Sequence, residues 1–434
     1  MVQDTLFDIQ QLTIKKKKAE KAERSGTFID NMKLPVHRWF RYSAGFSAAW
    51  VEEVLLSYNV TTVLDPFVGS GTVCVAADKL NIASYGVESH PFVFRLARGK
   101  LSWAETISDF EIAIKDLVMA AKQVREGVSV KDTPILIEKC YSAEHLKNLY
   151  RVKAAYFELS SKWSGPINDL VFLAINSILR VTSHVGTAQW QYVLPNKSKA
   201  RVTSPYDALD LQAKMMMADM AFMQGYSKSS HANLLQVDAR ALLGIPDNSI
   251  DLVVTSPPYA NNYDYADATR LEMTFWGEVS SWGDLHESVR QYLIRSSSQH
   301  ASKDKLQLEQ LLADPDILPI KEELTIVCNK LDKIRTTKGG NKAYHLMLAA
   351  YFGDMAKTFK ALRRVAKENS TICLVIGDSA PYGVHAPVER WFGELALAFG
   401  FKSWEFEKIR DRNVKWKNRK HDVLLHEGRL WIKG

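Results

Sequence analysis

The stretch from Ile250 to Tyr265 constrains the fold more than any other part of the chain. It opens with an apolar run, Ile250 to Val254, which is typical of a buried strand in an α/β sheet. Two prolines follow, and because proline cannot donate to a strand ladder, the strand is predicted to stop at Ser256. The sequence T-S-P-P-Y, Thr255 to Tyr259, is then held at the carboxyl end of a strand, where open α/β sheets bind their ligands.

The residue types in this turn fit one particular chemistry. An exocyclic amino group on a base is a poor nucleophile, because its lone pair is delocalised into the ring. The Ser256 hydroxyl and the Pro257 carbonyl can accept the two amino protons and return that lone pair to nitrogen. Pro258 adds rigidity, and Tyr259 can stack on a base that has left the duplex. An ordinary Pro-Pro turn after a strand is the alternative that this motif alone leaves open.

A second motif, V-L-D-P-F-V-G-S-G-T, runs from Val63 to Thr72. An apolar strand end leads into Asp65, and the glycines open a helix. Gly69 and Gly71 allow a tight turn and close approach of the backbone to a ligand. The loop lacks the Lys-Ser/Thr of a phosphate loop and does not fit G-x-G-x-x-G. One strand–helix unit later another strand is predicted to end at Glu88, where a carboxylate can bond ribose hydroxyls.

The two motifs together resemble those of the amino-methylating DNA methyltransferases, which use S-adenosylmethionine (SAM). The catalytic tetrapeptide here is S-P-P-Y, and its first residue, Ser256, resembles that of the cytosine-N4 branch. The adenine-N6 branch more often carries aspartate or asparagine at that position. The resemblance covers roughly residues 36–103, 233–265 and 343–430. It implies a Rossmann-like α/β fold with a mostly parallel seven-stranded sheet and helical insertions, SAM as cofactor and double-stranded DNA as substrate.

The resemblance also implies roles for single residues. The segment Val36 to Tyr42, with Phe46, is similar to the one that closes over the methionine end of SAM. Glu88 is expected to bond the ribose, and Asp238 is similar to the acidic residue near the adenine. The residues expected around the methionine part are Asp65, Phe67, Gly69, Gly71 and Thr72. Those expected to hold the flipped base are Ser256, Pro257, Pro258 and Tyr259.

The cysteines exclude one related chemistry. None of them follows a proline, whereas cytosine-C5 methyltransferases resemble one another in a Pro-Cys nucleophile. The cysteines do not have the spacing of metal ligands, so they give no reason to expect a metal. Cys74 and Cys373 lie in apolar segments and are predicted to be buried thiols, which favours a reducing compartment. The four cysteines are Cys74, Cys140, Cys328 and Cys373.

Composition and charge are those expected of a cytoplasmic protein, and the charge suits a polyanion as partner. No apolar run approaches the roughly 20 residues of a membrane span. The charged N-terminus does not fit a secretory signal peptide. The net charge of +7 suits a nucleic acid, although alone it is a modest signal.

The predicted domain plan interleaves methyltransferase segments with two insertions. Helical periodicity at 110–124, 143–159, 167–181 and 208–223 indicates that the first insertion is helical. The last two strands are predicted at 403–409 and 422–425, the final one antiparallel. The plan is a basic, polar tail at 1–30, cofactor motifs at 31–103, a helical candidate DNA-recognition region at 104–232, the catalytic motif at 233–269, a lid or recognition element at 270–342, and the end of the methyltransferase domain at 343–434.

Two basic stretches are candidates for DNA contact. The first is a loop within the helical insertion, with Trp190, Lys197, Lys199 and Arg201. The second lies between the last two strands, with Lys415, Lys417, Arg419 and Lys420. For both, a solvated surface is the alternative.

The order of the motifs leaves the subclass open. The glycine motif comes first here, whereas many cytosine-N4 enzymes resemble the opposite order. An adenine-N6 DNA enzyme, an RNA base methyltransferase and a non-catalytic SAM-binding protein therefore remain alternatives. A cognate restriction endonuclease acting on the same site is a further partner that the residues neither support nor exclude.

Overall fold

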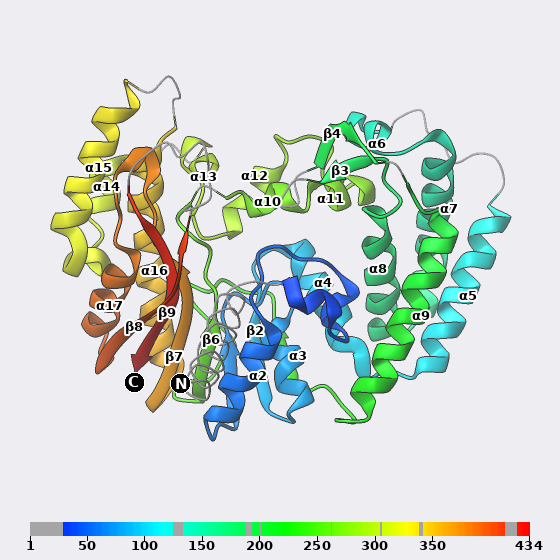
Figure 1. Cartoon of the computed structure of the whole chain (residues 1–434), viewed down its shortest axis with the longest axis horizontal. Helices are drawn as coiled ribbons and strands as arrows, with labels where there is room; N and C mark the ends of the chain where they lie inside the picture. Colours follow the sequence, from blue (N-terminus) through cyan, green and yellow to red (C-terminus); the bar gives the residue numbers. More distant parts are fainter. Residues whose placement is uncertain are drawn as a thin grey trace, which may run out of the picture.

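The computed structural model describes residues 29–124, 133–187, 193–199, 201–261, 263–303, 306–337, 342–412 and 423–434. Its centre is a seven-stranded sheet with the strand order β5-β2-β1-β6-β7-β9-β8 (Figure 1). Adjacent strands from β5 to β7 pair in parallel, and β9 is antiparallel to both of its neighbours. The strands are β1 (Thr62–Asp65), β2 (Ala83–Val87), β5 (Ala232–Leu235), β6 (Ile250–Thr255), β7 (Ala366–Gly377), β8 (Ser403–Arg412) and β9 (Leu425–Lys433). The predicted fold class is confirmed.

The apolar run of β6 is buried on both faces of the sheet. Leu252 and Val254 share one core with helices α2 and α3, while Val253 shares another with α16 and α17. Because successive side chains of a strand point to opposite faces, a continuous apolar run is what a sheet covered on both sides requires. The helices next to the sheet are α2 (Ala48–Ser57), α3 (Thr72–Lys79), α4 (Pro91–Leu101), α16 (Tyr344–Val365) and α17 (Val388–Ala398).

The first insertion forms a group of long helices beside the sheet (Figure 1). These helices and α4 share one hydrophobic core. Its residues include Phe92, Leu149, Phe172 and Met216. The helices are α5 (Ile107–Gln123), α6 (Ile135–Cys140), α7 (Ala143–Leu159), α8 (Gly165–Leu179) and α9 (Pro205–Gln224). The predicted helical periodicity is therefore confirmed.

One part of this insertion was predicted wrongly as a loop. The backbone pairs β3 (Val185–Thr187) with β4 (Val193–Ser198) in an antiparallel two-stranded sheet. Pro195 lies within β4, and a two-stranded sheet tolerates it because both of its strands are edges. Proline at a sheet edge and proline in a loop look alike in the sequence.

The second insertion connects the two cores. Phe275 and Trp276 pack against Tyr150, Tyr156 and Phe172 of the helical group, whereas α15 packs on α16. Helix α10 (Tyr265–Ala268) lies just before this insertion. Its own helices are α11 (Arg270–Trp276), α12 (Leu285–Ser288), α13 (Ser298–Lys303), α14 (Leu308–Leu312) and α15 (Lys321–Arg335). Short 3-10 helices are η1 (Ile29–Lys33), η2 (His37–Trp39), η3 (Ser102–Ala104), η4 (Ser160–Lys162), η5 (Arg290–Tyr292), η6 (Pro315–Ile320) and η7 (Pro381–Gly383).

The last strand lies further along the chain than predicted, at Leu425–Lys433 instead of 422–425. The predicted strand stops short of Gly428, and glycine is a residue type that usually weakens a strand. Here the ring of Phe406 on β8 fills the space beside Gly428, where a Cβ atom would lie 2.3 Å from the ring. Glycine is therefore required by packing within this strand.

All four cysteines are buried free thiols, as predicted for Cys74 and Cys373. Among the described residues, no helix is long and apolar enough to cross a membrane.

Candidate functional site

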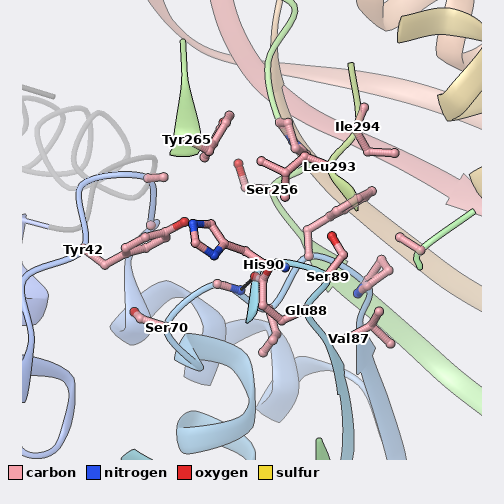
Figure 2. A pocket seen from close by; sticks show the side chains of 18 of the residues that line it. Tyr42, Ser70, Val87, Glu88, Ser89, His90, Ser256, Tyr265, Leu293 and Ile294 are labelled. Carbon is pink, nitrogen blue, oxygen red and sulfur yellow. Dashed lines mark hydrogen bonds between the residues drawn. The ribbon is translucent and has the colours of Figure 1, made fainter. Parts of the chain in front are cut away.

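A cavity opens at the carboxyl edge of the sheet, where the two motifs meet (Figure 2). The glycine loop, the end of β2, the segment after β5 and the turn after β6 all contribute to its wall. The predicted site residues that line it are Phe46, Phe67, Gly69, Thr72, Glu88, Asp238, Ser256 and Pro258. Parallel strands present their carboxyl ends at one edge, which is why motifs far apart in the sequence share this cavity.

Asp65 supports the cavity without lining it. Its Oδ1 accepts a hydrogen bond from the Thr255 hydroxyl at 2.6 Å and another from the Phe67 amide at 3.1 Å. These bonds tie the end of β1 to the end of β6. Asp65 Oδ2 is buried and has no partner among the described residues. Burial raises the pKa of the Asp65 carboxyl to about 7, against the lowering effect of the two hydrogen bonds.

The raised pKa of Asp65 predicts a pH-dependent stability. The folded state holds this proton more tightly than the unfolded chain, so the free energy of unfolding should fall as pH rises from about 4 to about 7. Asp65→Asn should remove that contribution, and its stability relative to wild type should rise by up to about 4 kcal/mol across this range. Urea unfolding of both proteins from pH 4 to pH 8 measures the difference. A difference that stays constant with pH would contradict the assignment.

Gly69 and Gly71 shape the loop in different ways. Gly69 has a φ of 52°, and a Cβ atom there would lie 3.0 Å from the Tyr42 ring. Gly71 has a φ of 91° and caps α3, but it does not line the cavity. Both positions need the left-handed backbone that glycine adopts without strain.

Glu88 faces the cavity from the end of β2 (Figure 2). Its Oε2 accepts the Gly69 amide at 3.0 Å, and its Oε1 accepts the His90 amide at 2.8 Å. Removal from bulk water raises the pKa of Glu88 to about 8, and nearby Asp65 acts in the same direction. Each carboxylate oxygen retains acceptor capacity for a ligand hydroxyl, because one carboxylate can accept about four hydrogen bonds.

Asp238 also lines the cavity, but its carboxylate is already engaged. Arg240 contacts Asp238 Oδ2 at 2.6 Å and Asp354 Oδ1 at 3.1 Å. The Arg240 amide donates to Asp238 Oδ1 at 2.8 Å. This network holds the loop after β5 against α16.

The segment before Tyr42 is fastened by a residue that the sequence reasoning missed. Asp219 on α9 accepts hydrogen bonds from the Val36 amide at 3.1 Å and the Trp39 indole at 2.9 Å, and it pairs with Arg38 at 2.6 Å. Val36 has a φ of 63°, which is rare for a β-branched residue. The signal in the sequence that could have identified Asp219 was an acidic residue within an apolar helical run. The helical insertion therefore fixes the segment that leads to the cavity.

The T-S-P-P-Y turn is held from two sides. The Ser256 hydroxyl donates to the Val375 carbonyl on β7 at 3.1 Å. The Tyr351 hydroxyl on α16 donates to the Pro258 carbonyl at 2.8 Å. Pro257 and Tyr259 do not line the cavity, and Tyr259 is half-buried beside Arg412, whose guanidinium lies 5.3 Å from the ring centroid.

Several aromatic and apolar side chains at the cavity were not predicted. His90 is buried with Nε2 3.0 Å from the Thr269 hydroxyl, and burial lowers its pKa to about 3, so its ring is neutral. The others are Tyr265, Tyr292, Leu293 and Ile294, whereas Tyr42, which also lines the cavity, belongs to the predicted segment 36–42. Tyr292, Leu293 and Ile294 come from the second insertion, so this insertion supplies a wall of the cavity.

The candidate DNA contacts are only partly described. Lys197 and Arg201 are exposed, whereas Lys199 donates from Nζ to the Arg180 carbonyl at 2.6 Å and is partly buried. The remaining candidates lie outside the described residues: Trp190, Lys415, Lys417, Arg419 and Lys420.

One group among the described residues has the spacing of metal ligands, at the carboxyl end of β7. His426 lies 3.1 Å from Asp378 and 3.5 Å from Glu389, and His385 lies 3.0 Å from Asp378. Asp378 also shares a hydrogen bond with the His385 ring at 3.0 Å and accepts one from the backbone amide of His426 at 2.7 Å.

The chain is similar to known DNA methyltransferases. A family model of the N6/N4 type, described as DNA methylase, matches residues 3–99. The Type II methyltransferase M.BsoBI of Geobacillus stearothermophilus is 25% identical, with 93% of this chain and 87% of the relative covered. These matches support a DNA amino-methyltransferase family. M.AvaI of Anabaena variabilis is 22% identical over 86% of this chain and 81% of its own length. M.MvaI of Kocuria varians is 19% identical over 89% of this chain and 87% of its own length.

The architecture around the cavity fits these similarities. The mostly parallel seven-stranded sheet is that of a Rossmann-like methyltransferase fold. Methyltransferases of this family generally use SAM. The cavity therefore lies where such a fold places its ligand, outside the carboxyl ends of the strands.

Proposed function

We propose that this methyltransferase transfers a methyl group from SAM to the exocyclic amino group of a base flipped out of double-stranded DNA, and that the base is cytosine, methylated at N4. The observation that carries the proposal is the position of Ser256. Its hydroxyl lines the same cavity as Glu88 and the glycine loop. An acceptor for an amino proton and the groups expected to bind SAM therefore face one enclosed space.

The hydrogen bonding of Ser256 decides what it can do there. Its hydroxyl has one proton, and that proton is donated to the Val375 carbonyl at 3.1 Å. The oxygen therefore presents lone pairs to any further partner, so it acts as an acceptor. Accepting an amino proton returns electron density to the nitrogen of the base. The Tyr351 hydroxyl and the Pro258 carbonyl hold this turn rigid, which limits reorganisation during the reaction.

The cavity residues fit SAM by their chemistry. Glu88 offers carboxylate oxygens to ribose hydroxyls. Burial raises the pKa of this carboxyl to about 8, and hydroxyls that donate to it would lower that pKa and favour the charged form. Phe46, Phe67 and Leu293 offer apolar surface to an adenine ring. When bound, SAM supplies a methyl group on a positively charged sulfur. The chain's own part is to orient the two reactants and to exclude water.

Serine at position 256 favours cytosine over adenine. A neutral hydroxyl is a weaker acceptor than a carboxylate, and the serine form of the motif resembles the cytosine-N4 branch. Lys197 and Arg201, both exposed on the first insertion, are proposed to contact DNA phosphates. We also propose a cognate restriction endonuclease as partner, since the relatives are named Type II methyltransferases.

The test is incubation with labelled SAM and unmodified DNA, followed by nucleoside mass spectrometry. N4-methylcytosine is the expected product. N6-methyladenine alone would overturn the base assignment and leave fold and cofactor standing. Methylation of RNA but not DNA would favour an RNA enzyme. SAM binding without transfer to either nucleic acid would identify a non-catalytic binding protein. 5-Methylcytosine would overturn the mechanism, because no Pro-Cys nucleophile is present.

A further inference from the structure

A second, smaller cavity adjoins the first between the glycine loop and the segment that follows η2. Tyr42, Gly45, Ser70 and Thr72 line both cavities. The remaining residues of the smaller cavity are Asn31, Met32, His37, Phe40 and Lys100. The two cavities therefore meet at the part of the loop that the sequence analysis assigned to the methionine end of SAM.

Lys100 is a buried cation without a counter-charge. Its side chain comes from the end of α4, and the residue is only 2% exposed. Its Nζ donates to the His37 carbonyl at 3.0 Å, the Ser70 hydroxyl at 3.3 Å and the Phe40 carbonyl at 3.4 Å. All three acceptors are neutral. Among the described residues, no carboxylate forms an ion pair with it.

A buried ammonium group without an anion is costly, and proteins generally pair such charges. Nearby charges follow that rule: Asp219 pairs with Arg38, and Arg98 on α4 pairs with Asp169. Lys100 is the exception in this region of the described structure. Burial accordingly lowers the pKa of Lys100 to about 7. A bound anion would supply the missing charge and hold the lysine protonated.

We propose that Lys100 binds the carboxylate at the methionine end of SAM. This inference rests on the proposed SAM binding and adds the group that recognises the amino-acid part of the cofactor. The contacts of Nζ to Ser70 and Phe40 are long, so an incoming carboxylate can replace them at little cost. The charge-assisted bond gained is stronger than the neutral ones lost.

A purely structural role for Lys100 makes a different prediction. In that case the lysine only joins the segment at His37 to the glycine loop at Ser70, and its removal would loosen the whole site. Binding of any ligand of the cavity would then weaken by the same factor. The two roles are separated by a ligand that differs from SAM only in the carboxylate.

The experiment measures binding of SAM and of decarboxylated SAM by calorimetry to wild type, Lys100→Met and Lys115→Met. Methionine keeps the unbranched shape and most of the length of the lysine side chain without its charge. Lys115, an exposed lysine on α5 that pairs with Glu111, serves as the matched control. Wild type and Lys115→Met should bind SAM about 10- to 100-fold more tightly than the decarboxylated analogue. Lys100→Met should bind both ligands equally, with the affinity that wild type has for the analogue.

Two results would overturn this proposal while leaving SAM binding intact. One is wild-type protein that does not distinguish the two ligands, which needs no variant to fold. The other is Lys100→Met that weakens both ligands by the same factor and keeps their ratio. Wild type that binds neither ligand would overturn the proposed function as well, and that outcome is distinct from the first two.

Discussion

Ser256→Ala is expected to lower the rate of methyl transfer by about 10²- to 10³-fold, because one amino proton of the base loses its acceptor in a closed site. SAM affinity should change little, since the bonds expected to hold the cofactor come from Glu88 and the glycine loop. The loss should therefore be seen in kcat, measured with saturating SAM and DNA. Losing the bond to the Val375 carbonyl should cost only about 1 kcal/mol of stability.

Ser256→Thr is the matched control for this prediction. Threonine keeps the hydroxyl that can donate to Val375 and accept from the base, so it should retain more activity than alanine. Thermal unfolding of both variants shows whether the turn remains folded. If Ser256→Ala turned over at the wild-type rate, the assigned role of the hydroxyl would be wrong.

Gly69→Trp is expected to abolish SAM binding while the sheet still folds. A Cβ atom at this position would already lie 3.0 Å from the Tyr42 ring, and the φ of 52° is strained for any side chain. The indole would also have to enter the cavity that Gly69 lines. Because the loop faces a ligand and not the core of the sheet, the circular dichroism spectrum should stay close to wild type.

Gly165→Trp is the control for the added indole. Gly165 begins α8 in the helical insertion, and a Cβ atom there has no heavy atom within 4 Å. This variant should bind SAM with wild-type affinity in calorimetry. Normal SAM affinity in Gly69→Trp would show that the cavity is not the cofactor site.

The two motifs could be predicted from the sequence because their signals are local. The run before Ser256 is apolar and ends at two prolines, and the run before Asp65 ends at a glycine loop. Each pattern specifies a strand followed by a turn without help from distant residues. That both strands are parallel and adjacent, as β1 and β6 are, then brings the motifs to one edge.

The supports of the site were beyond sequence reasoning because they come from distant parts of the chain. Asp219 fastens the segment at Val36 from 183 positions away. Tyr351 holds Pro258 from 93 positions away. Tyr292, Leu293 and Ile294 belong to the insertion predicted as a lid or recognition element, but its sequence did not indicate which of its residues would line the cavity. Nothing in the pattern of one segment specifies its contacts with another.

Local sequence patterns were enough to place Asp65, Glu88 and Ser256 at the ligand edge of the sheet, because strand ends and glycine turns are set by nearby residues. The role of each residue there depends on its tertiary contacts. Glu88 and Ser256 line the cavity, whereas Asp65 turns to Thr255 and supports it from behind. Lys100 gives no signal in the sequence, yet packing leaves it buried beside the glycine loop without a counter-charge. The direction and the partners of a side chain depend on the neighbours that folding brings to it.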